Sequence, residues 1–337
     1  MSRIVLAVCF GAVLGTLFAA PAMTESNRQR AAVAFQVGLS AIARGEFIRA
    51  RGAFERALKL GALGAGYNLG LMYNLGWGVK VDRRRACDYY EIASRSRMPK
   101  PMHNLGTCFY AGHGRPKDYR KAATWYRRAA AVGHVRSYCA LGNMVRKGKG
   151  FQRNVKRGIA LCRKAAEAGD ADAKADLGTI YLRGEGVPVD HGRAAHWLSA
   201  AARQGQPNAQ YLHALQLWNG DGVTQNRGRS ACWLRAAALR GQRNAPLPLG
   251  AYYYTKSFNT KTKRLFTDPS TKAVMWLLFA TRIDPKASSR KKARFLARKL
   301  LDIEPGLLAR AQVEYKKTRK RVVPIGGPRR FTPINCP

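Results

Sequence analysis

The stretch that decides the fold runs from Leu177 to Gly205 and reads L-G-T-I-Y-L-R-G-E-G-V-P-V-D-H-G-R-A-A-H-W-L-S-A-A-A-R-Q-G. Its two turn glycines, Gly184 and Gly186, have counterparts at steps of 36 residues along the chain. These are Gly76, Gly112, Gly148 and Gly220 for the first, and Gly78, Gly114, Gly150 and Gly222 for the second. A fixed period of this size is typical of stacked repeats, because each unit buries its apolar face only against its neighbours.

Each unit carries the signals of two helices joined by a turn. Asp190 follows the turn glycines and is a residue type that caps a helix by accepting a backbone N–H bond. The same position in the other units holds Asp82, Asp118, Asn154 and Asn226. Ala194, Trp197 and Ala201 then share one helical face, and Gly205 suits the left-handed position after a helix. The sequence therefore predicts an all-α fold, a right-handed α-solenoid of stacked helix-turn-helix units with a 36-residue period. A phosphate-binding loop is the alternative for the glycines, but no G-K-[ST] segment follows any of them.

The segment from Leu177 to Gly205 resembles the Sel-one-like repeat, a solenoid relative of the tetratricopeptide repeat. Five such units cover residues 62–241. The resemblance implies an all-α superhelix that acts as an adaptor or scaffold, often in bacterial envelopes. It does not identify a partner.

The segments on either side of the five units predict capping structures, because the end of a solenoid must meet water. Gly38 to Gly61 resembles an ordinary tetratricopeptide unit with a shorter turn. After the array, an enlarged loop over Ser257–Pro269 interrupts a sixth unit, and Ser288 and Pro305 are expected to begin two further helices. The predicted segments are residues 1–22 (signal peptide), 23–61 (helical pair), 62–241 (five repeats), 242–284 (atypical sixth repeat), 285–317 (capping hairpin) and 318–337 (basic disordered tail).

The N-terminus has the features of an export signal. Arg3 precedes an apolar stretch from Ile4 to Ala22, which ends in the small-x-small sequence Ala20-Pro21-Ala22. We expect cleavage near Ala22 and a periplasmic or secreted protein. The alternative is an uncleaved N-terminal membrane anchor, since the apolar stretch is nearly long enough to span a bilayer.

The net charge predicts an acidic partner. The chain has 60 Lys and Arg against 19 Asp and Glu, a formal net charge of +41, and the cations gather towards the C-terminus. The predicted polyanion-binding residues are Arg290, Lys291, Arg294, Arg298, Lys316, Lys317, Arg319, Lys320 and Arg321. In an envelope the partners would be lipopolysaccharide phosphates, anionic lipid headgroups at a peripheral membrane contact, acidic polysaccharide or an acidic protein. Export argues against nucleic acid, for which the chain has no recognised fold motif. The alternatives are a solvated basic face and a compositional bias of the source organism.

The first helix of each unit is expected to line a concave groove, by analogy with the tetratricopeptide superhelix. Amphipathic aromatic side chains beside Arg and Asn are typical of binding surfaces. The predicted groove residues are Tyr67, Asn74, His103, Tyr110, Arg136, Asn143, Arg146, Lys147, Arg183, Tyr211, Trp218 and Asn219. The alternative is that half of them pack against neighbouring helices. A cluster of acids, Glu167, Asp170, Asp172 and Asp176, is expected to pair with nearby Arg and Lys.

Nothing in the sequence indicates catalysis. The six histidines lack metal-ligand spacing, carboxylates that could act as general acids or bases are scarce, and no nucleophile motif such as G-x-S-x-G is present. We therefore predict no catalytic residues, no metal site and no cofactor.

Six cysteines remain after signal cleavage, an even number that permits disulfides in an exported protein. Cys139 and Cys162 lie equally far from the centre of their turn, so an antiparallel hairpin would bring them level. This pair is the best disulfide candidate, and free buried thiols are the alternative. The cysteine-rich secreted branch of the resembled family repeats a cysteine pair in every unit, which this chain does not, so no activity of that branch is implied.

These observations lead to the hypothesis of a non-catalytic, exported repeat scaffold that binds a protein or a polyanion in the bacterial cell envelope. One alternative is a periplasmic regulator that restrains a sensor protein, similar to the family's exopolysaccharide regulators. Another is a secreted effector that binds nucleic acid or a host membrane through its basic surface.

Overall fold

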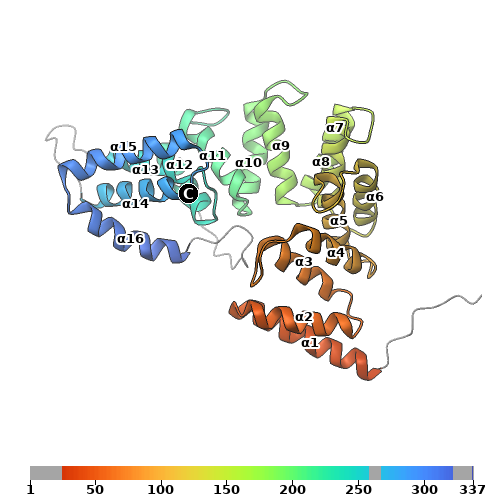
Figure 1. Ribbon diagram of the computed structural model, residues 1–337. Helices are drawn as coiled ribbons and strands as arrows, with labels where there is room; N and C mark the ends of the chain where they lie inside the picture. The colour runs from red at the N-terminus through yellow and green to blue at the C-terminus, as the bar shows by residue number, and fades with distance from the viewer. Residues whose placement is uncertain (1–24, 258–266, 322–335, 337) are drawn as a thin grey trace, which may run out of the picture.

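The computed structural model describes residues 25–257, 267–321 and 336, and these residues form helices with no strand (Figure 1). The helices are α1 (Glu25–Arg44), α2 (Phe47–Lys59), α3 (Ala65–Leu75), α4 (Arg83–Ser94), α5 (Pro99–Ala111), α6 (Tyr119–Ala131), α7 (Arg136–Lys147), α8 (Val155–Glu167), α9 (Ala171–Arg183), α10 (His191–Arg203), α11 (Pro207–Asn219), α12 (Arg227–Leu239), α13 (Pro246–Lys256), α14 (Thr267–Ile283), α15 (Ala287–Ile303) and α16 (Leu307–Arg321). The predicted signal peptide lies outside the described residues.

Five hairpins of the predicted kind, α3–α4 to α11–α12, form units 1 to 5. In unit 4 the Arg193 backbone N–H donates to Asp190 Oδ1 at 2.7 Å, which starts α10, and the equivalent bond starts α4, α6, α8 and α12. Gly184 has φ of 64° and Gly205 has φ of 84°, a backbone conformation that favours glycine. The predicted all-α solenoid and its helix-turn-helix unit are thereby confirmed.

The core of each unit is built from small residues that let the helices approach closely. In unit 4, Leu177, Ala194, Leu198 and Ala201 are fully buried. A Cβ added to Gly178 would lie 2.5 Å from Leu198 Cγ, so the leucine side chain occupies the space that the glycine leaves. The repeated alanines and glycines are therefore packing residues, as burial of a unit against its neighbour requires.

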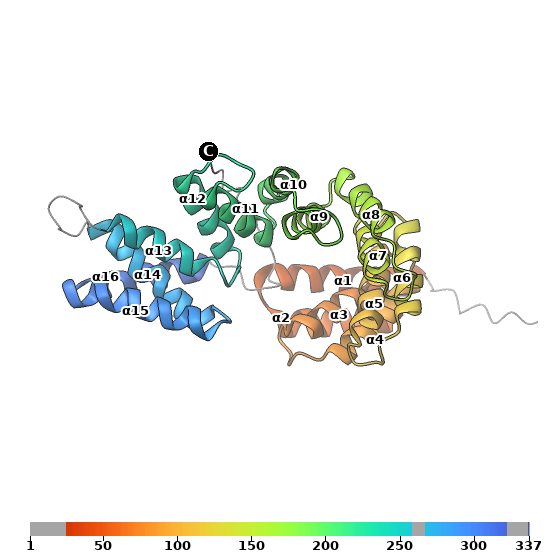
Figure 2. The same ribbon diagram turned by 90° about the horizontal axis from the view of Figure 1, so that it is seen from above.

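The array bends along its length. The axes of α3 and α4 run in a clearly different direction from those of α9 and α10 (Figures 1 and 2). The first helix of each unit is here called helix A, and α9 and α11 lie nearer the inside of the bend than α10 and α12 (Figure 2). The surface that these first helices form is called the A-helix face below.

The C-terminal cap differs in detail from the sequence prediction. The α13–α14 pair forms unit 6, and α14 packs against α13, α15 and α16. α15 begins at Ala287, so Ser288 lies inside its first turn and is not the cap; instead Asp284 Oδ1 accepts a bond from the Lys286 N–H at 2.9 Å. The expectation for Ser288 is wrong because the helix already begins at Ala287, with Lys286 in the cap position and no side-chain cap bond.

The boundaries predicted for the enlarged loop and for the C-terminal tail also shift. α14 already begins at Thr267, inside the predicted loop over Ser257–Pro269. α16 begins at Leu307, two residues after Pro305, and extends to Arg321, so residues 318–321 are helical rather than part of a tail. Residues 322–335 and 337 lie outside the description. α16 packs against α14, and Leu307 and Ala311 in its first turns are fully buried.

The described part of the chain contains three disulfides, one within a hairpin and two between more distant segments. Cys139 and Cys162 are bonded across the α7–α8 hairpin, with their Cα atoms 3.8 Å apart. Cys87–Cys108 connects α4 with α5, and Cys232–Cys336 attaches the C-terminal region to α12. The last two pairs connect separate units or distant segments, so the positions of their cysteines within a single hairpin could not predict them.

Among the described helices, none is both long and apolar enough to cross a membrane.

Candidate binding groove

Two hollows open on the A-helix face. The central hollow, of about 380 Å³, lies over units 2 to 5 and is lined by His103, Tyr126, Arg136, Cys139, Ala140, Asn143, Asp172, Ala173, Ala175, Asp176, Gln206 and Asn208. The terminal hollow, of about 310 Å³, is lined by Tyr211, Leu215, Trp218, Asn244, Leu247, Pro248, Ala251, Asp284, Lys286, Ser289 and Lys292. The first is mostly polar and the second joins aromatic side chains to lysines.

Polar groups of the central hollow satisfy one another. Arg136 Nη2 lies 2.7 Å from Asp172 Oδ2, and the Gln206 amide donates to the other oxygen of Asp172 at 3.3 Å. The Asn143 amide donates to Asp176 Oδ2 at 3.0 Å. The mass of protein around Asp176 disfavours its charged form and raises the pKa of its carboxyl. Internal pairing thus accounts for most of the charge in this hollow.

His103 in the central hollow is a packing residue rather than a titrating one. Ser137 Oγ lies 2.9 Å from the Nδ1 atoms of both His103 and His134, and the two imidazole rings are 4.5 Å apart. Burial lowers the pKa of His103 to about 3 and also lowers the pKa of His134, so both rings are neutral at physiological pH. Ser137 is fully buried, and the cluster therefore joins units 2 and 3 without offering an accessible nucleophile.

The terminal hollow combines apolar walls with free cations. Tyr211 and Trp218 reach it from α11, and the Trp218 ring also meets Tyr252 edge-on at 6.3 Å. Lys286 and Lys292 come from the start of α15, outside the repeats. Asp284 is the one acid among the lining residues, and its carboxylate is buried and accepts a backbone bond. The hollow therefore presents positive charge beside aromatic surface.

The structure divides the twelve predicted groove residues into two groups. His103, Arg136, Asn143, Tyr211 and Trp218 line the two hollows. The others do not line them.

Internal contacts hold several of the remaining groove residues. Arg146 is buried, with Nη1 2.8 Å from Glu185 Oε2, and Arg183 lies 3.6 Å from the same carboxylate. Asn219 donates to Asp221. The rest are Tyr67, which meets the Tyr90 ring, Tyr110, which meets Tyr119, the half-buried Asn74 and the exposed Lys147. These contacts agree with the alternative expectation, in which part of the predicted groove residues pack against neighbouring helices.

The repeat pattern did not predict Lys286 and Lys292, which line the terminal hollow. They belong to the cap rather than to the repeat, so the 36-residue period carried no signal for them. Only the fold of α15 back against α13 brings them to the terminal hollow.

The predicted polyanion-binding residues are mostly exposed. Lys291, Arg294 and Arg298 are exposed on α15, whereas Arg290 donates to the backbone oxygens of Asp284 and Pro285. On α16, Lys316, Lys317 and Arg319 are exposed, while the side chains of Lys320 and Arg321 lie outside the description. None of these cations is among the residues that line the central or the terminal hollow.

The fold and its groove define a class of protein: an α-solenoid of short helical hairpins that offers a concave surface to a partner. The family model for the Sel1 repeat matches residues 65–97, 102–134, 135–170, 171–206 and 207–242, just over half of the chain. The protein therefore belongs to the Sel1 repeat family, whose members generally act as non-catalytic scaffolds for protein–protein interaction.

One solved structure supports the same fold, and two others are more distantly similar. A Sel1 repeat protein from Oxalobacter formigenes is 27% identical with a TM-score of 0.52, over 73% of this chain and 96% of that one. A protective antigen of uropathogenic Escherichia coli is 21% identical, with a TM-score of 0.43 and coverage of 89% and 71%. An immunity protein from Pseudomonas aeruginosa is 20% identical, with a TM-score of 0.45 and coverage of 71% and 82%. No curated protein matches the chain significantly.

Proposed function

We propose that this protein is an exported, non-catalytic scaffold of the bacterial cell envelope that holds an acidic segment of a partner protein in its terminal hollow. The observation that carries the proposal is the meeting of Tyr211 and Trp218 with Lys286 and Lys292 in one hollow. Tyrosine and tryptophan are typical anchors of protein interfaces, and the two lysines add positive charge beside them.

The charge of the hollow selects the partner's chemistry. Lys286 and Lys292 are exposed, and the carboxylate of Asp284 already accepts a backbone N–H. An Asp or Glu side chain of a partner could therefore form ion pairs with Lys286 and Lys292, while an adjoining apolar residue would pack against Trp218. A basic segment would meet repulsion at the same place.

Neighbouring lysines on α15 provide a matched test of the hollow. Lys292 lines it, whereas Lys291 does not. A Lys286→Gln/Lys292→Gln variant and a Lys291→Gln/Arg294→Gln control lose the same charge from the same helix region. Partners are captured from the native envelope at low and high salt, and the bound segment is mapped by cross-linking. We expect an acidic segment that binds the control at least tenfold more tightly than the hollow variant. Equal binding to both, or a bound segment without acids, refutes the proposal.

Export rests on the sequence of residues 1–22. If the signal acts as expected, the native protein begins at or near Met23 and is recovered outside the cytoplasm. N-terminal sequencing of the native protein tests this. Recovery of the intact chain from the cytosol would contradict export and would revive nucleic acid as a partner.

An anionic membrane surface is a second candidate partner, favoured by one residue of α15. The Phe295 side chain is 56% exposed, and Lys291, Arg298 and Lys299 lie three or four residues away on the same helical face. An exposed aromatic ring among cations suits the interface of an anionic bilayer. Vesicles of phosphatidylglycerol should bind the protein, and Phe295→Ala should weaken that binding more than Val132→Ala, a change at another exposed apolar site. Equal effects of the two changes would rule this candidate out.

A further inference from the structure

A second kind of hollow recurs along the turn edge of the array, away from the A-helix face. It lies between the turn of one unit and the second helix of the unit before, and is here called a turn niche. The first niche has about 880 Å³ and is lined by Arg51, Tyr73, Val79, Lys80, Val81, Asp82, Arg83 and Arg85. The second has about 520 Å³ and is lined by Lys156, Ile159, Ala160, Arg163, Tyr181, Val187, Pro188, Val189, Asp190 and Arg193.

The two niches are the same position of the repeat in units 1 and 4. Tyr73 and Tyr181 are 108 residues apart, which is three periods of 36, and the same step relates Arg85 to Arg193. In both niches the guanidinium carbon lies 5.7 Å from the centre of the tyrosine ring. The Nε atom of the same arginine also forms an ion pair with the aspartate that caps the helix, at 3.5 Å in unit 1 and 3.2 Å in unit 4.

The ring and the cap carboxylate together hold the cation in place. A cation over an aromatic face is attracted by the ring quadrupole, and a fixed guanidinium loses less entropy when it binds an anion. The pairing also occurs at the equivalent positions of two other units, where Lys121 lies 5.7 Å from the Phe109 ring and Lys272 lies 5.9 Å from the Tyr253 ring. The turn edge therefore presents a row of oriented cations.

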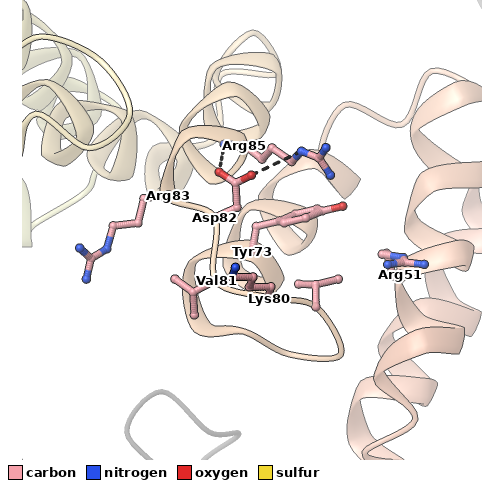
Figure 3. Close-up of a pocket in the computed structure, with 8 residues that line it drawn as sticks. Arg51, Tyr73, Lys80, Val81, Asp82, Arg83 and Arg85 are labelled. Carbon is pink, nitrogen blue, oxygen red and sulfur yellow. Dashed lines mark hydrogen bonds and ion pairs between the residues drawn. The ribbon is translucent and has the colours of Figure 1, made fainter.

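Each niche adds cations from the helix before it. Figure 3 shows Arg51 reaching from α2 towards the turn that carries Lys80 and Val81, while Arg83 points to the other side. In the second niche Lys156 and Arg163 come from α8, and Arg163 donates to the Tyr181 hydroxyl at 3.3 Å. One acid stands among the lining residues of each niche, and it is the helix cap. The excess of positive charge calls for an anionic ligand.

In unit 2 the equivalent position holds an arginine whose charge is neutralised by acids of the preceding unit. Arg115 takes the place of Val79 there and pairs with Asp88 at 2.9 Å and Glu91 at 3.1 Å, both from α4. Units 1 and 4 have valine instead of this arginine, so this ion pair is missing and Lys80 and Lys156 remain exposed at their niches. Open niches are thus a property of particular units and not of the repeat as such.

We propose that the turn niches bind a linear acidic polysaccharide, with anionic groups of one chain held in the niches of units 1 and 4. The bend of the array favours a flexible polymer over a flat membrane, because the hairpins of these two units run in clearly different directions (Figures 1 and 2). Nucleic acid is disfavoured because Tyr73 and Tyr181 are only 7% and 5% exposed, so no ring is free to stack on a base.

Size-defined oligogalacturonides are the probe. Binding is measured by titration calorimetry at about 50 and 200 mM salt, with neutral dextran, phosphatidylglycerol vesicles and single-stranded DNA in parallel. We expect affinity to rise at least tenfold from short to long oligomers, since only a long chain can occupy two niches at once. Equal affinity for all lengths, or tighter binding of vesicles or DNA than of the long oligomer, overturns the proposal.

Two sets of variants separate the niches from net charge. Four niche cations are removed in Lys80→Gln/Arg85→Gln/Lys156→Gln/Arg193→Gln, and four exposed cations elsewhere in Arg56→Gln/Lys59→Gln/Arg203→Gln/Arg235→Gln. The niche variant should bind long oligomers at least tenfold more weakly and show a shallower salt slope, by about 3 for four lost contacts. The control should change affinity by less than twofold. An equal loss in both refutes the niches as sites.

The ring contact is tested without any change of charge. Unit 5 carries Leu217 where units 1 and 4 have tyrosine, so Tyr73→Leu/Tyr181→Leu introduces a residue that the repeat accepts. This variant should retain its helical signal and bind about threefold more weakly, because its arginines are no longer held. Unchanged affinity would refute the role of the rings. All of these variants leave the terminal hollow intact, so their outcome is independent of the proposed protein partner.

Discussion

The α7–α8 and α9–α10 hairpins have the same repeat pattern but pack their helices in different ways. In α7–α8, a Cβ added to Gly142 would lie 2.4 Å from the backbone oxygen of Gly158, so two backbones meet directly. In α9–α10, a Cβ added to Gly178 would meet the side chain of Leu198 at 2.5 Å. Ala194 stands in unit 4 where Gly158 stands in unit 3.

The difference shows that one position of a repeat can have two packing solutions. Where both facing residues are glycine, the helices come close enough for a disulfide between Cys139 and Cys162. Where one is alanine, a leucine side chain fills the gap. An added methyl group would meet a backbone oxygen in unit 3 but chiefly a leucine side chain in unit 4, which can change its rotamer more easily than a backbone can move. The two units should therefore respond differently to the same substitution.

The largest effect is expected from adding a methyl group at the glycine. Gly142→Ala should destabilise the protein by about 3 kcal/mol, because α7 and α8 must separate, and Gly178→Ala by about 1 kcal/mol, because Leu198 can shift. Urea unfolding of both variants measures the difference. Lys149→Ala, at an exposed position, is the control and should stay within about 0.5 kcal/mol of the parent. Equal losses at the two glycines would mean that the comparison is wrong.

Removal of the covalent link should have the next largest effect. The Cys139→Ser/Cys162→Ser variant should lose about 3 kcal/mol or slightly less, because the bond closes a loop of 23 residues and restricts the unfolded chain. Hydrogen exchange should increase in α7 and α8 and stay unchanged in α10. A loss below about 1 kcal/mol would show that glycine contact alone holds this hairpin together.

Acid should weaken the junction of units 2 and 3, where His103 of α5 meets Ser137 of α7, before it weakens unit 4. The pKa of His103 is lowered to about 3 by burial, so the unfolded chain takes up protons below about pH 6.5 while the folded ring stays neutral. The stabilisation is complete above pH 6.5 and is lost as the pH falls towards 3, with about 2 kcal/mol of it lost by pH 5. Unit 4 has only the exposed His191 and His196. Hydrogen exchange at pH 7, 5 and 4 should show earlier opening at His103 and Ser137, and a His103→Gln variant should show a smaller pH dependence. Simultaneous opening of this junction and of unit 4 would contradict this.

The smallest effect should be the same in both hairpins. Asn154→Ala and Asp190→Ala each remove the side chain that accepts the backbone N–H three residues later, at 2.9 and 2.7 Å, and each should cost about 1 kcal/mol. Thermal melts of the two variants provide the comparison. A difference above about 1 kcal/mol would show that local capping also depends on how the unit packs.

Local features of the fold could be predicted from the sequence because they depend on neighbours within one unit. The 36-residue period, the caps at Asp190 and its counterparts, and the left-handed conformation of Gly184 and Gly205 all follow from residue types at fixed spacing. The backbone N–H groups and φ angles concerned lie within a few residues of the side chains that control them. The family resemblance rested on the same local pattern.

Tertiary structure decided which residues form the candidate binding surface. Arg146 appeared available in the sequence, but Glu185 in the turn of the next unit pairs with it. Lys286 and Lys292 had no place in the repeat, yet the cap brings them beside Trp218. Cys232 meets Cys336 across 104 residues of chain. The sequence by itself determined the hairpin and its repetition, because those depend on short-range backbone bonds. Which charges remain free at a surface was determined only when the units stacked and the cap folded back, because Coulomb and packing energies depend on distances in space rather than on separation along the chain.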